Sequence, residues 1–183
     1  MQYQKQITLK SGKTCILRNG TNEDAKAVYE IFQKTHEETD YLLSYPEETT
    51  MTIEEEGEFL QEKANAPREV EILAIIDGQV VATAGIHALG SKYKVKHRAD
   101  FGISVLQAYW NEGIGKALTE SCIACAKEAG YTQLELDVVA ENDRALALYR
   151  SLGFIEYGRN PKGFFSKLSG YQELVAMRLE LQE

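Results

Sequence analysis

The chain has few cysteines and no long apolar run, and both shortages narrow the kinds of protein it can be. It has 183 residues and three cysteines, Cys15, Cys122 and Cys125. An odd cysteine count, with an N-terminus that lacks the apolar core of a secretory signal, is typical of reduced thiols. We therefore expect a cytoplasmic protein. Because no apolar stretch is long enough to span a bilayer, we expect no membrane association.

Basic residues are also scarce. Lys and Arg number 20 against 28 Asp and Glu, which gives a net charge of −8. A nucleic-acid-binding surface needs an excess of basic residues, so we expect no nucleic-acid partner. An acidic chain is mildly better suited to cationic partners such as amines. The sequence contains no repeat, low-complexity segment or linker, and its length predicts a single domain over residues 1–183.

The spacing of Cys122 and Cys125 is C-x-x-C, a pattern that also occurs in metal and redox sites. Both residues, however, fall on the apolar face of a predicted helix. No second Cys or His pair follows at the spacing of a zinc site. We therefore expect the pair to pack in the core and predict no metal.

The rest of the chain is organised around residues 100–130, which read as a strand, a glycine loop and a helix. Phe101, Ile103 and Val105 are apolar residues two apart, the period of a strand. Apolar residues then recur three or four apart, as on one face of a helix: Ile114, Leu118, Cys122, Cys125 and Ala129. Gly130 is suited to end that helix, because glycine adopts the left-handed conformation easily.

Gly113 and Gly115 lie where the helix begins. The first turn of a helix has N–H groups without intrahelical partners, and together with the macrodipole they form an anion site. Lys116 adds a positive charge. An ordinary strand-to-helix turn is the alternative. A P-loop is excluded because Trp110 stands where its first glycine is needed and Ala117 where Ser or Thr is needed. A dinucleotide-binding fingerprint is excluded because Leu118 replaces its third glycine.

A second segment, LELDVVAENDRALALYRSLGF at residues 134–154, reads as strand, helix and strand. Together the two segments resemble the GNAT N-acyltransferase superfamily, which pairs a Q/R-x-x-G-x-G/A loop with a later N-x-x-A-x-x-L-Y-x-x-x-G-F segment. The matching residues are Gly113, Gly115, Asn142, Ala145, Leu148, Tyr149, Gly153 and Phe154. Trp110 departs from the pattern, because the family has Gln or Arg there, and Glu112 stands where a cation is common.

The order of the elements predicts a three-layer α/β fold with a mixed, largely antiparallel sheet flanked by helices. The resemblance implies the same GNAT-like fold, with a sheet that splays between strands ending near Val105 and Val138. Expected helices run from Thr21 or Asn22 to about 40 and from a capping box at Thr52 to Asn65. Expected strands cover residues 7–9, 14–17, 70–76, 80–89, 94–105, 134–138, 154–157 and 171–181, with loops at 41–51 and 159–170.

The resemblance also implies where acetyl-CoA binds. Backbone groups of the loop would hold the pyrophosphate: Asn111, Glu112, Gly113, Ile114, Gly115 and Lys116. The strand end formed by Ile103, Ser104 and Val105 would pair with the amides of the pantetheine arm and polarise the thioester. Asn142 would contact that arm and cap the following helix, and Ala145 would leave room for it.

Two side chains are predicted to move protons. By resemblance, Tyr149 reaches the CoA sulfur and protonates the departing thiolate. Asp100 is the acid nearest to the loop and our candidate for the base, although in a regular strand it faces away from Val105, so that only a bulge would turn it inward. His97, His87, Glu37, Glu38 and a chain of waters are alternatives.

The predicted function is transfer of an acetyl group from acetyl-CoA to a primary amine of a small molecule or peptide, by direct attack in a ternary complex. A non-catalytic acyl-CoA-binding sensor is the alternative, and a nucleotide-phosphate-binding protein is a third interpretation. Many members of the family are dimers, so a homodimer through the last strand is a further expectation, by analogy.

Overall fold

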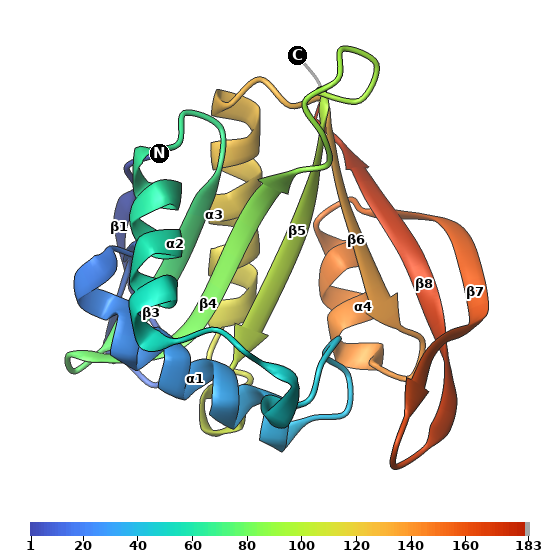
Figure 1. Cartoon of the computed structure of the whole chain (residues 1–183), viewed down its shortest axis with the longest axis horizontal. Helices are drawn as coiled ribbons and strands as arrows, with labels where there is room; N and C mark the ends of the chain where they lie inside the picture. The colour runs from blue at the N-terminus through green and yellow to red at the C-terminus, as the bar shows by residue number, and fades with distance from the viewer. Residues whose placement is uncertain (182–183) are drawn as a thin grey trace.

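The computed structural model describes residues 1–181 as one eight-stranded sheet with helices on both faces (Figure 1). The strands are β1 (Gln4–Thr8), β2 (Thr14–Asn19), β3 (Val70–Ile76), β4 (Gln79–Ala88), β5 (Arg98–Val105), β6 (Gln133–Val139), β7 (Ile155–Ser166) and β8 (Gly170–Glu180). The helices are η1 (Asn22–Asp24), α1 (Ala25–Glu38), η2 (Pro46–Glu48), α2 (Ile53–Asn65), η3 (Gln107–Tyr109), α3 (Ile114–Glu128) and α4 (Asp143–Ser151). Helices α1 and α2 cover one face of the sheet, and α3 and α4 the other.

Local signals in the sequence set several of these boundaries. Thr52 Oγ1 accepts a hydrogen bond from Glu55 N at 3.2 Å, and Glu55 Oε2 accepts one from Thr52 N at 2.7 Å, so the predicted capping box is confirmed. Asp77 and Gly78 have φ values of 51° and 79°, as a two-residue hairpin turn between β3 and β4 requires.

The sheet is antiparallel except where β5 meets β6. Its order is β1-β2-β3-β4-β5-β6-β8-β7. The parallel pair β5–β6 is in register only from Arg98–Gln133 to Asp100–Glu135, although β5 continues to Val105 and β6 to Val139. In Figure 1 the two strands run side by side at one end and separate toward the other. The predicted splayed, largely antiparallel sheet is therefore confirmed.

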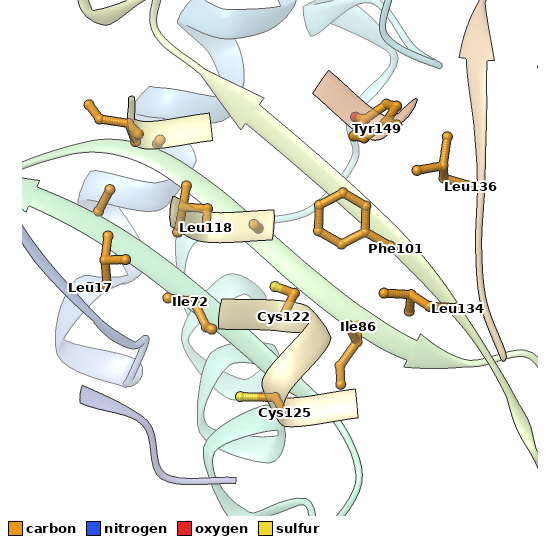
Figure 2. Packing of buried hydrophobic residues seen from close by; sticks show 14 of the residues in the cluster. Leu17, Ile72, Ile86, Phe101, Leu118, Cys122, Cys125, Leu134, Leu136 and Tyr149 are labelled. Carbon is orange, nitrogen blue, oxygen red and sulfur yellow. The ribbon is translucent and has the colours of Figure 1, made fainter. Parts of the chain in front are cut away.

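The core lies between the sheet and α3 and continues under α4 (Figure 2). Cys122 and Cys125 of α3 are 0% and 2% exposed and lie among aliphatic side chains such as Ile86 and Leu134. Burying one such side chain stabilises a fold by roughly 1.5–3 kcal/mol. The expectation that the cysteine pair packs in the core is confirmed.

The strand expected at residues 94–105 starts later, at Arg98. Val95 N and Lys96 N both donate to Lys92 O at 2.9 Å, so the basic run before β5 folds into turns. Most of these residues are exposed, and the alternation that predicted the strand applies only from Arg98 onward.

The loop expected at residues 159–170 was wrong, because β7 extends to Ser166 and only three residues separate it from β8. β7 is an edge strand whose pairing with β8 shifts register twice, between Glu156 and Gly158 and between Asn160 and Phe164. An edge with bulges tolerates Pro161, which lacks a backbone donor. The basic and polar composition of residues 159–166 therefore led to the prediction of a loop where the structure has a strand.

The last strand, β8, pairs with β6 on one side and β7 on the other. It therefore has no free edge at which a second copy could add a strand; β1 and β7 are the edges of the sheet. None of the helices in the described part of the chain is both long and apolar enough to cross a bilayer.

Candidate active site

The opening between β5 and β6 leads into a cavity of about 610 Å³. Residues from β5, β6, α3, α4 and the segment that follows α1 line it. Every site residue predicted from the sequence lines this cavity except Glu112: Asp100, Ile103, Ser104, Val105, Asn111, Gly113, Ile114, Gly115, Lys116, Asn142, Ala145 and Tyr149. Residues from distant parts of the chain are thus brought together around one space.

The start of α3 presents free backbone donors to the cavity. Gly113 is the N-cap, with φ of 94°, a conformation that glycine adopts without strain. The helical bonds begin with Ala117 N donating to Gly113 O at 3.1 Å, and the N-cap has no side chain to occupy the donors before it. The N–H groups of residues 114–116 are therefore available to an anion.

Glu112 does not face the cavity. Its carboxylate accepts a hydrogen bond from Ser11 N at 3.0 Å, and its carbonyl accepts one from Lys10 N at 3.3 Å. The bond to Ser11 lowers the pKa of Glu112. This residue connects the glycine loop to the β1–β2 turn, so its charge is directed away from the cavity.

Trp110 and Arg144 form part of the site that sequence reasoning did not assign. Trp110 Nε1 donates to Val105 O at 2.8 Å, and the Arg144 guanidinium lies 3.4 Å from the centroid of the indole ring. Both residues line the cavity. The only signal in the sequence was the departure from the family pattern at Trp110; nothing local paired it with Arg144.

The edge of β5 beyond Asp100 has unpaired backbone groups. Leu106 N donates to Val81 O of β4 at 3.0 Å, so alternation along the strand directs the backbone groups of Ile103 and Val105 toward the opening. Trp110 uses the Val105 carbonyl. The N–H and C=O of Ile103 and the N–H of Val105 remain available to a ligand with amides, as in strand addition.

Asn142 and Tyr149 are carried by α4. Asn142 Oδ1 accepts a hydrogen bond from Ala145 N at 3.3 Å, which confirms the predicted cap. Tyr149 is 7% exposed and packs edge-on against Phe101, with ring centroids 6.2 Å apart. Figure 2 shows the two rings near the place where β5 and β6 part. Burial raises the pKa of Tyr149, so its phenol is protonated at neutral pH.

Asp100 follows the regular pleat of β5. The β4–β5 register runs without a shift from Ala82–Val105 to Ala88–Ala99, so the bulge that would turn Asp100 inward is absent from this pair. Asp100 faces the α1–α2 side of the sheet and still lines the cavity, because the opening reaches both faces. Burial, together with the negative charges of Asp137 and Glu135, raises the pKa of Asp100 to about 6.

The other acids and imidazoles considered as bases do not line the cavity: His97, His87, Glu37 and Glu38. His87 lies opposite Asp100 on β4, and burial lowers its pKa. Glu38 accepts a hydrogen bond from Gln107 N at 2.7 Å, which fixes the end of α1 beside the loop after β5.

Asp40 joins the segment after α1 to the β7–β8 turn. Its Oδ2 accepts hydrogen bonds from Ser166 Oγ at 2.6 Å, Ser169 Oγ at 3.0 Å and Gln172 Nε2 at 3.2 Å. In addition, Lys167 N donates a hydrogen bond of 2.8 Å to the Tyr45 hydroxyl. These bonds, which we call the Asp40 clasp, connect the two halves of the sheet across the opening.

Comparison with known proteins agrees with this geometry. The family model described as the acetyltransferase (GNAT) family matches residues 23–154. Among solved structures, an acetyltransferase of the GNAT family from Streptococcus pneumoniae superposes with a TM-score of 0.86 at 26% identity, covering 91% of this chain and 99% of that one.

Two curated relatives from Escherichia coli share part of the sequence. The [ribosomal protein bS18]-alanine N-acetyltransferase is 35% identical over 81 residues, 44% of this chain and 54% of the relative. The L-amino acid N-acetyltransferase AaaT is 32% identical over 100 residues, 54% of this chain and 61% of the relative. The chain thus matches little more than half the length of these relatives.

Proposed function

The chain belongs to the GNAT family of acetyltransferases, and from this premise we propose that it transfers an acetyl group from acetyl-CoA to a primary amine. The two curated relatives are named for different amine acceptors, the alanine of a ribosomal protein and an L-amino acid. An acceptor amine of a small molecule or peptide is common to both names, and we propose that class for this chain.

One observation carries the proposal: a candidate acid and a candidate base flank the opening at the same level. Phe101, which packs against Tyr149, is the neighbour of Asp100 in β5. Successive residues of a strand point to opposite faces. Tyr149 is therefore near one face of the opening and Asp100 on the other, as a reaction with a leaving group on one side and an amine on the other requires.

The groups around the cavity fit acetyl-CoA. The free N–H groups at the start of α3, with Lys10 and Lys116 nearby, suit a pyrophosphate. The backbone of Ile103 suits the amides of the pantetheine arm. When bound, acetyl-CoA supplies the acetyl group as a thioester.

In the proposed reaction this chain manages two protons. Asp100 accepts a proton from the ammonium of the acceptor, which then attacks as the neutral amine; the raised pKa of Asp100 brings it closer to the working pH of a general base. Tyr149 donates a hydrogen bond and then a proton to the departing sulfur. The amine attacks directly, because no cysteine lines the described cavity and Ser104 Oγ has Thr83 Oγ, not a base, at 3.4 Å.

We also propose that the protein is cytoplasmic and forms a homodimer. Light scattering after gel filtration tests for the homodimer. The function itself is tested by incubating acetyl-CoA with a panel of primary amines and following free CoA thiol. Amine-dependent thiol release supports an acetyltransferase. Tight acetyl-CoA binding without thiol release for any amine would instead favour the non-catalytic acyl-CoA sensor. A larger thermal shift with ATP than with CoA would favour a nucleotide-binding protein.

A further inference from the structure

Basic and acidic side chains line different parts of the cavity. Its lining contains three cations, Lys10, Lys116 and Arg144; the first two lie at the glycine loop, and Arg144 lies beside Trp110 and near Tyr41. Lys10 is bonded through its backbone to Glu112, Lys116 is in the first turn of α3, and Arg144 stacks on Trp110. The glycine-loop end suits the phosphates of the proposed cofactor.

Carboxylates line the other end, where β5 and β6 part. Asp100 is paired in register with Glu135, and Asp137 follows two residues later on the same face of the sheet. Asp100 and Asp137 both line the cavity, and neither forms an ion pair with any residue from 1 to 181. Burial and the charge of Glu135 raise the pKa of Asp137, as expected where negative charge is not neutralised.

Two arginines lie on the strands beside these acids. Arg98 holds Glu135 through two bonds of 2.5 and 2.6 Å. Arg178 is paired in register with Glu135, and its Nε lies 2.9 Å from Glu180 Oε1 without forming a hydrogen bond to any described residue. Neither arginine lines the cavity. Burial lowers the pKa of His87, opposite Asp100, which favours the neutral form of its imidazole. Among residues 1–181, therefore, no Lys or Arg side chain forms an ion pair with Asp100 or Asp137.

The walls on this face combine apolar side chains with the hydroxyls of Thr35, Thr39 and Tyr41. Leu174 of β8 pairs with Val139 and shares its face with Asp137. Leu42, Leu43 and Phe164 complete the wall. The Asp40 clasp holds these segments together, and its carboxylate is saturated with hydrogen bonds from Ser166, Ser169 and Gln172. A bound acceptor would therefore meet aliphatic and aromatic surface beside two unpaired carboxylates.

We propose that the acceptor is a primary amine on an apolar group, with no carboxylate on the carbon that bears the amine. This inference rests on the proposed function and narrows its acceptor. The positively charged form of such an amine is attracted to Asp100 and Asp137. When a free amino acid places its amine beside these two acids, its own carboxylate also comes close to them, and no ion-pair partner compensates its charge. Like charges in a partly desolvated site repel strongly. A peptide N-terminus or a simple amine satisfies the site, and a free amino acid does not.

Three acceptors separate the carboxylate from other effects: L-leucine, L-leucinamide and 3-methylbutylamine. All have the same branched apolar group, and 3-methylbutylamine is at least as basic as leucine, so amine ionisation cannot explain a preference for it over leucine. We expect kcat/KM for leucine to be at least about tenfold below both other values. Equal or higher kcat/KM for leucine would overturn the inference.

Variants locate the effect. Asp137→Arg should raise kcat/KM for leucine and lower it for 3-methylbutylamine. Glu141→Gln, which removes an acid just after β6 that does not line the cavity, should change neither by more than about twofold. A leucine value that stays unchanged in Asp137→Arg, in a protein with parental Tm and acetyl-CoA affinity, would contradict the assignment of Asp137.

A binding measurement tests the inference without turnover. Trp110 is the only tryptophan and lines the cavity, so its fluorescence reports ligands there. With CoA bound, 3-methylbutylamine and leucinamide should quench it at concentrations at least tenfold lower than leucine. If no amine is acetylated but this order holds, the proposed function fails, while the inferred preference of the cavity for amines without a carboxylate stands. If leucine binds as tightly as the other two, or none of the three binds, the inference fails.

Discussion

Replacing Tyr149 by phenylalanine separates its proposed chemical role from its packing. The ring of Tyr149 is 7% exposed and contacts Phe101 and Phe154, with centroids 6.2 and 5.7 Å away. Phenylalanine keeps both contacts and loses only the hydroxyl. No hydrogen bond within residues 1–181 uses that hydroxyl, so its loss should cost less than a typical hydrogen bond, about 0.5–1.5 kcal/mol, which for a protein of this size corresponds to at most about 6 °C in Tm.

The kinetic effect should be much larger than the effect on stability. General acid catalysis contributes roughly 10²- to 10⁴-fold, equivalent to about 3–5 kcal/mol in the activation free energy. We therefore expect kcat of Tyr149→Phe to fall by that factor while the KM for acetyl-CoA changes little. The assay is CoA thiol release at saturating acetyl-CoA, with an amine already shown to be a good acceptor.

Tyr131 provides a matched control. It is 2% exposed, its hydroxyl has no hydrogen-bond partner among the described residues, and it does not line the cavity. Tyr131→Phe should leave kcat within about twofold of the parent. If Tyr149→Phe also remains within twofold, or loses stability without losing turnover, Tyr149 is a core residue and the assignment of the general acid is wrong.

Three further predictions follow from the site. Asp100→Asn should remove the fall in kcat/KM below about pH 6, because the parent loses activity as Asp100 is protonated there; pH profiles that overlay would show that Asp100 is not the base. Gly115→Val should weaken acetyl-CoA binding at least about tenfold in calorimetry with the fold retained, since a Cβ at residue 115 meets only Leu148 Cδ2, at an ordinary 3.6 Å; unchanged affinity would refute the anion site. Asp40→Ala should leave Gln172 with fewer partners, lower the free energy of unfolding by about 1–3 kcal/mol and raise the KM for the amine more than that for acetyl-CoA; an equal rise in both would show that the Asp40 clasp does not shape the acceptor side.

Local patterns predicted much of the fold and of the cofactor side of the cavity. The cap at Asn142, the turn at Asp77 and the left-handed Gly113 depend on neighbours within a few residues, so a single sequence contains the information. The period of the apolar residues identified α3, and the same period placed Cys122 in the core. The short β5–β6 pairing, by contrast, was expected only from the resemblance.

Features that depend on contacts between distant residues were not predicted. Trp110 meets Arg144 and Asp40 meets Ser166 only because the fold brings their elements together. Glu112 faces the β1–β2 turn, a partner that no local pattern names. The second part of β7, residues 159–166, was mistaken for a loop because an edge strand with bulges can carry proline, glycine and charge where an inner strand cannot.

The most direct test of the central claim is a rapid-quench single turnover with excess enzyme, acetyl-CoA labelled in its acetyl group and an amine chosen from the panel. The account predicts that label appears on the amine at the same rate as free CoA is released, and that quenched protein carries no label at any time. Label on the protein before it reaches the amine would contradict direct attack. CoA that stays fully acetylated with every amine would contradict the assignment of this cavity as the site of an acetyl transfer.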